Sequence, residues 1–193
     1  MTRRLTALCA LGMMLVATAA LGAQTGPPAV DWQALQEAWT AYISAPSEEG
    51  AAKVFSLLPA QKIADIKDSF EVVNSFFERL GILEGEIYSG NPNAVKLGFR
   101  LYTIAYGTLE AGLNRILGSL IAFKPQLFLE ELQARRDLFP TLNPLLGSYL
   151  RDMANDPVAM ELEKKLRIKS LESVEDKALK SLRSECIKIL KKF

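Results

Sequence analysis

The side chains that most often carry out chemistry in proteins are scarce in this chain. It contains no histidine, and histidine is the commonest general base and a frequent zinc ligand. No serine is followed three residues later by lysine, and no glycine-rich phosphate loop is present. These absences predict a protein that is not an enzyme and that holds no metal or cofactor.

Closely spaced glutamates are the remaining candidates for acid–base chemistry. They are Glu84/Glu86, Glu130/Glu131 and Glu161/Glu163. The two carboxylates of a glycosidase face each other across a cleft, whereas residues one or two apart on a helix point in different directions. We therefore expect these pairs on solvated helix faces. A hydrolase of cell-envelope polymers that uses a glutamate acid stays an alternative.

The N-terminal residues have the layout of a secretory signal peptide. The stretch "MTRRLTALCALGMMLVATAALGAQ" has two arginines, an apolar middle and a run of small residues. We expect cleavage after Ala23, with the site after Gly22 nearly as good, so that residues 1–23 are removed and 24–30 form a short linker. An uncleaved membrane anchor over Leu5 to Ala23 is the alternative. The protein would then be exported, to the periplasm of a bacterium or to the outside. Removal of Cys9 would leave Cys186 as the one cysteine, with no internal disulfide.

Helical periodicity runs through the rest of the chain, residues 31–193. Asp31 is a candidate N-cap for a helix whose apolar stripe comprises Trp32, Leu35, Trp39, Tyr42 and Ile43. The last helix is expected to open with Ser173 and Asp176 and to bury Leu179, Leu182, Cys186, Ile189 and Phe193 on one face. Reactivity of a thiol needs exposure, so Cys186 is expected to be structural. No stretch alternates with the period of a strand.

Prolines divide this helical region at regular intervals. Pro59, Pro92, Pro125 and Pro157 are 33, 33 and 32 residues apart. Proline suits the first position of a helix, because its missing N–H is not needed there. Sixteen residues after each proline stands a hydroxyl residue that would cap a second helix: Ser75, Thr108, Thr141 and Ser173. Each unit of about 33 residues is therefore predicted to be a helix pair, although one helix running straight through Ser75 stays possible.

The second helices of two units share their apolar pattern at five positions. Leu109, Leu113, Ile116, Leu117 and Leu120 match Leu142, Leu146, Tyr149, Leu150 and Met153. In texture, residues 59–193 resemble α-solenoids of the HEAT/armadillo type. The predicted fold class is all-α, a short solenoid-like stack of helix pairs, with an irregular helical bundle as the alternative. The resemblance implies a curved surface that binds other macromolecules.

Small residues recur on the second helices and suggest where a partner would bind. Gly81, Gly85, Gly118 and Gly147 either allow neighbouring helices to approach closely or line a groove. In the second case, the polar contacts beside the groove would be Asn114, Arg115, Ser148 and Arg151. We expect a protein or peptide as the partner.

Charge narrows the choice of partner further. The formal net charge of +1 gives no reason to expect nucleic acid, which is usually bound by a strongly basic domain. Residues 158–193 hold 10 basic and 6 acidic residues, so docking of the basic C-terminal helix to a membrane surface is an alternative. A third alternative is an apolar small ligand, bound by Phe99, Tyr102, Tyr106 and Phe123.

Overall fold

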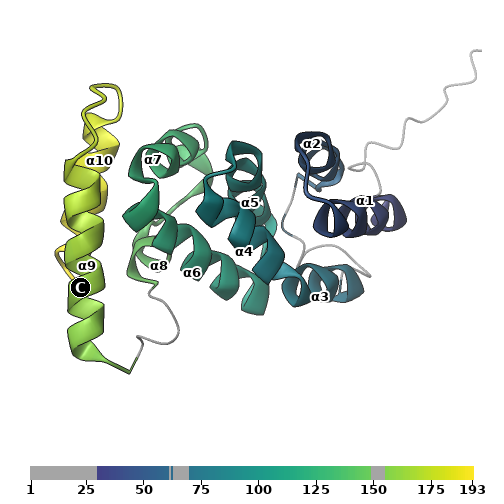
Figure 1. The fold of residues 1–193 in the computed structure, drawn as a ribbon, viewed down its shortest axis with the longest axis horizontal. Helices are drawn as coiled ribbons and strands as arrows, with labels where there is room; N and C mark the ends of the chain where they lie inside the picture. The colour runs from purple at the N-terminus through teal and green to yellow at the C-terminus, as the bar shows by residue number, and fades with distance from the viewer. Residues whose placement is uncertain (1–29, 61, 63–69, 149–154) are drawn as a thin grey trace, which may run out of the picture.

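The computed structural model describes residues 30–60, 62, 70–148 and 155–193. Throughout these ranges the only regular secondary structure is helical, and the predicted all-α class is confirmed (Figure 1). The α-helices are α1 (Trp32–Ser44), α2 (Glu48–Leu57), α3 (Phe70–Glu78), α4 (Leu80–Ser89), α5 (Pro92–Ile104), α6 (Gly107–Phe123), α7 (Pro125–Gln133), α8 (Asn143–Gly147), α9 (Pro157–Glu172) and α10 (Lys180–Leu190). A short 3-10 helix, Arg136–Leu138, lies between α7 and α8.

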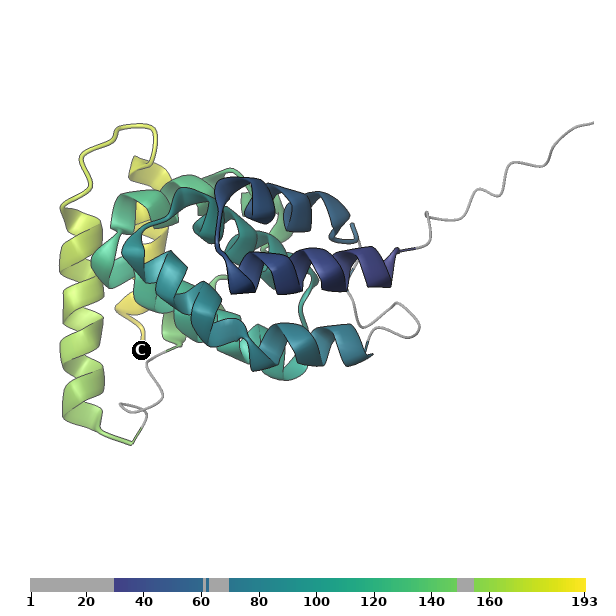
Figure 2. The ribbon, with the colours of Figure 1, turned by 45° about the vertical axis from the view of Figure 1, so that its right-hand side comes forward.

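Helix α6 is central to the fold, since it packs against α3, α4, α5, α7, α8 and α9. The α1–α2 pair lies at one end of the molecule and the α9–α10 pair at the other (Figures 1 and 2). The five apolar positions predicted for the second helix of this unit, Leu109 to Leu120, are all fully buried in α6. Contacts of this kind occur in a short stack of helix pairs and also in an irregular bundle, so they agree with both of the predicted arrangements.

Three of the four prolines begin helices, as predicted. Pro92, Pro125 and Pro157 each occupy the first turn, in α5, α7 and α9. Asn91 and Asp156 precede two of them and accept hydrogen bonds from backbone amides of the first turn. The fixed backbone angle of proline and the carboxylate or amide cap therefore act together at these helix starts. Pro59 lies after the end of α2, and the helix expected to follow it falls largely outside the described residues.

The hydroxyl residues do not cap second helices as predicted. Ser75 lies within α3, where its Oγ donates to the Val72 carbonyl, so the alternative of a helix that runs through Ser75 is the correct one. Thr108 lies inside the first turn of α6, whose N-cap is Tyr106. A serine or threonine hydroxyl can bond a carbonyl three or four residues earlier, and this makes it compatible with helix interiors as well as caps.

The other two hydroxyl positions differ from each other. The Thr141 Oγ1 accepts a hydrogen bond from the Asn143 amide at 3.3 Å, just before the five-residue helix α8. Ser173, by contrast, ends α9 as its C-cap, and its Oγ donates to the Ser170 carbonyl. The sequence predicts that the last helix starts at Ser173. This prediction is wrong, since α10 begins at Lys180.

The N-terminal part of the core follows the predicted stripe. Asp31 caps α1 by accepting from the Ala34 amide at 2.9 Å. Trp39 packs edge-on against Phe76 of α3, with ring centroids 4.7 Å apart, and its Nε1 donates to the Ser75 carbonyl. Four residues of the predicted stripe are buried, Leu35, Trp39, Tyr42 and Ile43.

The C-terminal helix buries most, but not all, of its predicted face. Leu179, Leu182 and Cys186 are buried, Ile189 is partly buried, and Phe193 is exposed. Burial raises the pKa of the Cys186 thiol to about 12, which agrees with the structural role expected from its position.

The predicted signal peptide, residues 1–23, and nearly all of the linker lie outside the described residues. In the part of the chain that the structure describes, no helix has the length and apolar character needed to cross a membrane.

Candidate protein-binding surfaces

Arg115, the central residue of the predicted polar surface, is bound to a neighbouring helix. Its two Nη atoms donate to the Glu84 carboxylate of α4 at 2.8 and 2.9 Å. This two-pronged geometry is the strongest that a guanidinium and a carboxylate form, and both side chains are only partly exposed. The contact explains Arg115 as a link between α4 and α6.

Of the other predicted contacts, Asn114 is buried and Ser148 is partly exposed. Asn114 is 7% exposed, and its Oδ1 accepts no hydrogen bond from the described protein. The Ser148 Oγ donates to the Pro144 carbonyl at 2.8 Å. Arg151 lies outside the described residues. Arg115 and Ser148 are therefore both partly exposed and both already engaged in contacts within the chain.

The small residues divide into two groups. A Cβ atom at Gly118 would lie 2.5 Å from the Leu145 carbonyl oxygen, and one at Gly147 would lie 2.7 Å from the Phe193 ring. Gly118 therefore permits the close approach of α6 to α8 that one of the two interpretations predicts, whereas Gly147 makes room only for the Phe193 side chain. Gly81 and Gly85 are exposed, and a Cβ atom at either would meet nothing within 4 Å. They do not bring helices together.

A buried ion pair that the sequence did not reveal joins three helices. Arg167 of α9 is fully buried, and its Nε donates to the Glu163 carboxylate at 2.8 Å. Its Nη1 donates to the carbonyls of Leu146 and Ser148 at 3.2 and 2.7 Å. Its Nη2 reaches the Ser119 Oγ of α6 at 3.4 Å. The guanidinium thereby holds α9 against α6 and the end of α8.

The glutamate pairs are less solvated than expected. Glu131 and Glu163 are each 7% exposed, so the expectation of a solvated face is wrong for both. Each forms an ion pair with an arginine four residues later: Arg135, which lies just past the end of α7, and Arg167, which lies on α9. This spacing puts the two side chains on one face, and tertiary packing then covers that face. An uncompensated acid, as the hydrolase alternative requires, is not found at either position.

The four aromatic residues of the small-ligand alternative do not come together. Phe99 is fully buried between Phe128 and Phe139, and Tyr102 stacks on Phe139 at 5.1 Å. Tyr106 and Phe123 stand at opposite ends of α6, which are about 25 Å apart at the rise of an α-helix. In the described ranges, no cluster of acidic or cysteine side chains could hold a metal ion either.

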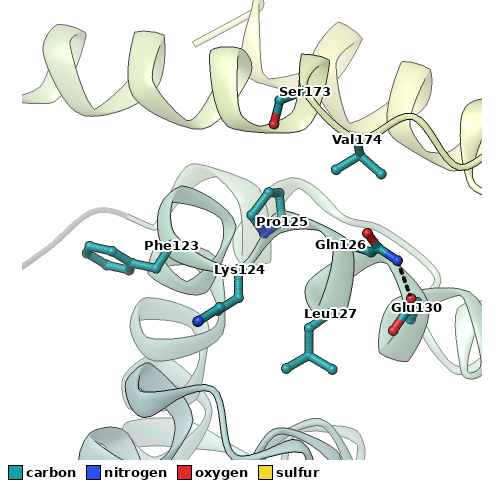
Figure 3. A pocket seen from close by; sticks show the side chains of 8 residues that line it. All are labelled: Phe123, Lys124, Pro125, Gln126, Leu127, Glu130, Ser173 and Val174. Carbon is teal, nitrogen blue, oxygen red and sulfur yellow. Dashed lines mark hydrogen bonds between the residues drawn. The ribbon is translucent and has the colours of Figure 1, made fainter.

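A shallow hollow lies at the corner where α6 meets α7. Its volume is about 380 Å³, at the small end of the range for ligand pockets. Figure 3 shows residues of the α6–α7 corner on one side and the end of α9 on the other. The hollow is lined by Phe123, Lys124, Pro125, Gln126, Leu127, Glu130, Ser173 and Val174.

Phe123 is the most unusual side chain of this hollow, because 56% of it is exposed. Its ring contacts Tyr88 of α4 with a centroid separation of 5.6 Å, which supports it from one side. Gln126 and Glu130 are joined by a hydrogen bond of 2.9 Å and form part of a polar rim (Figure 3). The hollow thus combines an exposed aromatic, further apolar wall and charged edges.

A second exposed apolar feature lies on α9. Val158, Leu162 and Leu166 are 70%, 62% and 45% exposed, and their spacing of four residues aligns them along one side of the helix. Neither feature was identified in the sequence as a binding surface, although Phe123 was noted among the aromatics. The four-residue spacing on α9 is visible in the sequence, but only the structure shows that these side chains are exposed and that no helix of the described ranges covers them. No family model, curated protein or solved structure matches this chain.

Proposed function

We propose that this chain is an exported, non-enzymatic helical protein that binds a protein or peptide partner in the cell envelope. The observation that carries the proposal is the exposed ring of Phe123 beside the hollow at the α6–α7 corner. Exposed aromatic side chains in a rigid, partly apolar setting are typical anchors of protein interfaces. The partner would insert an apolar side chain next to Phe123.

The setting of Phe123 supports a peptide rather than a small molecule. The hollow is open and shallow, with Pro125, Leu127 and Val174 as its apolar wall. Lys124 and Glu130 place opposite charges on its edges. An extended segment that crosses the hollow could bury one apolar residue and still pair its own polar groups with this rim, as interfaces with an apolar centre do.

The helical framework supports display of such a site. Phe123 ends α6, the helix that contacts most of the others, and Pro125 begins α7 two residues later. Sites on helices packed into a core are held more precisely than sites on loops. Binding then requires little rearrangement, and rigidity lowers its entropic cost.

Selection of peptides from a displayed random library on the purified protein tests this proposal. We expect enriched peptides that carry an apolar anchor and that bind Phe123→Asp about thirtyfold more weakly or worse, the loss typical of a central anchor. Phe55→Asp is the matched control, because Phe55 is a partly exposed phenylalanine on α2. Its binding should be unchanged. Failure to enrich any peptide, or equal binding to Phe123→Asp, would overturn the proposal.

A further inference from the structure

The exposed apolar row on α9, formed by Val158, Leu162 and Leu166, faces away from the rest of the molecule. Three of the large apolar side chains that are exposed in the described chain lie in this row. Helix α9 runs along the outer edge of the fold, with the body of the protein on its other side (Figures 1 and 2). That inner side carries the buried residues Glu163, Arg167 and Leu171. None of the helices described covers the outer side, which can therefore meet another molecule.

Charged residues of both signs flank the row on one edge. Glu161 and Lys165 each precede a leucine of the row by one residue, so both lie on the same edge. Both are exposed, and within the chain the Glu161 carboxylate pairs with Lys164 and lies 3.8 Å from the Lys165 ammonium group. An edge that carries both signs can pair with its own copy, because a twofold axis brings the same patch of two subunits together.

The spacing of the row limits how two copies of α9 could pack. We consider two antiparallel copies of α9 related by a twofold axis. When this axis lies level with residue 161, 163 or 165, row residues of one copy lie midway between row residues of the other, so the two rows interdigitate. Side chains of the two helices then alternate along the contact, as ridges of one helix fill grooves of the other. If the axis lies at another level near the middle of the row, row residues of the two copies lie directly opposite each other or leave gaps.

Charge selects one of these three registers. With the axis level with residue 161, the Glu161 carboxylates of the two copies face each other. With the axis level with residue 165, the two Lys165 ammonium groups face each other. With the axis level with residue 163, Glu161 of each copy faces Lys165 of the other, and this happens twice. This register joins interdigitation of the apolar row to attraction beside the axis, with no like charges of this edge facing each other. In the register at residue 165, Glu161 of each copy lies level with Lys169 of the other, but the two Lys165 ammonium groups repel each other at the axis.

We propose that α9 is a self-association surface, on which a second copy of this chain docks its own α9 antiparallel, with the twofold axis level with residue 163. The surface is separate from the hollow beside Phe123, so the inference does not depend on the proposed function. The row is short compared with interfaces that bury about 800 Å² per partner. The dimer is therefore weak, with a dissociation constant of about 10 µM or higher.

Sedimentation of the purified protein over about 5–500 µM tests this inference. We expect a concentration-dependent dimer in the unchanged protein. Leu162→Asp puts a charge in the centre of the contact and should leave a monomer throughout this range. Ile82→Asp is the matched control, since Ile82 is 41% exposed on α4, and it should dimerise normally. Circular dichroism confirms that both variants are folded.

Charge exchange tests the register itself. Glu161→Lys and Lys165→Glu each replace two attractive contacts by two repulsive ones, and each should weaken the dimer about tenfold. The double exchange restores the attraction and should recover most of the affinity. If the apolar row associated without a defined register, the double exchange would not recover the affinity.

Three outcomes would overturn the inference. The first is a monomer at every concentration, including the case in which the monomer instead binds anionic vesicles through Leu162. The second is a dimer that Leu162→Asp leaves intact. The third is a double exchange no tighter than either single exchange. Because Phe123→Asp should leave the dimer intact and Leu162→Asp should leave peptide binding intact, the two proposals succeed or fail separately.

Discussion

Gly118→Ala tests whether the close approach of α6 to α8 sets the stability of the fold. A Cβ atom at this position would lie 2.5 Å from the carbonyl oxygen of Leu145 and 3.2 Å from that of Ser148. Both atoms belong to the backbone, so no rotation of a side chain relieves the overlap. Helix α8 would have to move, and this would also stretch the hydrogen bonds of Arg167 to the carbonyls of Leu146 and Ser148.

The size of the effect follows from two opposing terms. Overpacking at a well-packed contact costs about 1–3 kcal/mol. Replacing a glycine inside a helix by alanine contributes about 0.5–1 kcal/mol of stability. We therefore expect Gly118→Ala to lower the free energy of unfolding by about 1–2 kcal/mol. Gly85→Ala is the matched control, because a Cβ atom there meets nothing within 4 Å, and it should raise that free energy by about 0.5–1 kcal/mol.

Urea unfolding followed by far-ultraviolet circular dichroism measures both variants. Linear extrapolation gives the free energy of unfolding, and an unchanged dependence on urea shows that the unfolding transition is the same. The opposite signs expected for the two substitutions are the critical result. If Gly118→Ala stabilised the protein as Gly85→Ala does, close packing would not be the reason for glycine at position 118.

Two further predictions concern buried groups at this end of the molecule. Arg167→Met leaves the Glu163 carboxylate buried without its arginine and should lower the free energy of unfolding in urea by about 3–5 kcal/mol. Arg167→Met combined with Glu163→Met should lose clearly less, and an equal loss would mean that the stranded carboxylate is not the source of the cost. Burial raises the pKa of the Cys186 thiol to about 12, so in a Cys9→Ser background the native protein should react very slowly with a thiol reagent at about pH 8. Reaction should become fast in urea, and rapid reaction of the native protein would contradict the burial of Cys186.

Features of the fold that depend on local chemistry were predictable from the sequence. Pro92, Pro125 and Pro157 begin helices because a missing N–H has no cost in the first turn. Asp31 caps α1 because its carboxylate reaches an amide three residues later. The five apolar residues of α6 that share one face by helical periodicity, Leu109 to Leu120, are all buried. Each of these depends on neighbours within a few residues along the chain.

The hydroxyl residues show where local reasoning ends. A serine can bond an amide at the start of a helix or a carbonyl of a preceding turn, and both bonds are local. Ser173 was expected at the start of a helix and ends one instead. The regular spacing of hydroxyls therefore predicted the wrong start for the last helix, although the proline spacing was informative.

The candidate surfaces depended on tertiary structure to a greater degree. Leu162 is an apolar residue on a helix, and so is Leu171, yet only Leu171 is covered. Likewise Glu161 is exposed and Glu163 buried, two residues apart on α9. The order of residues in a helix shows which of its sides are apolar and which are polar, but not which side packs against a neighbouring helix.

By itself, the sequence determined the all-helical class, the starts of α1, α5, α7 and α9 and the lack of histidine chemistry, because these depend on residue type and short-range spacing. Tertiary structure alone decided which glycines need to be small, which arginine is buried and which apolar side chains stay in solvent. The physical reason is that a side chain is buried only when a second surface packs against it. Whether a side chain loses its water depends on the helix packed against it, and that helix comes from a distant part of the chain.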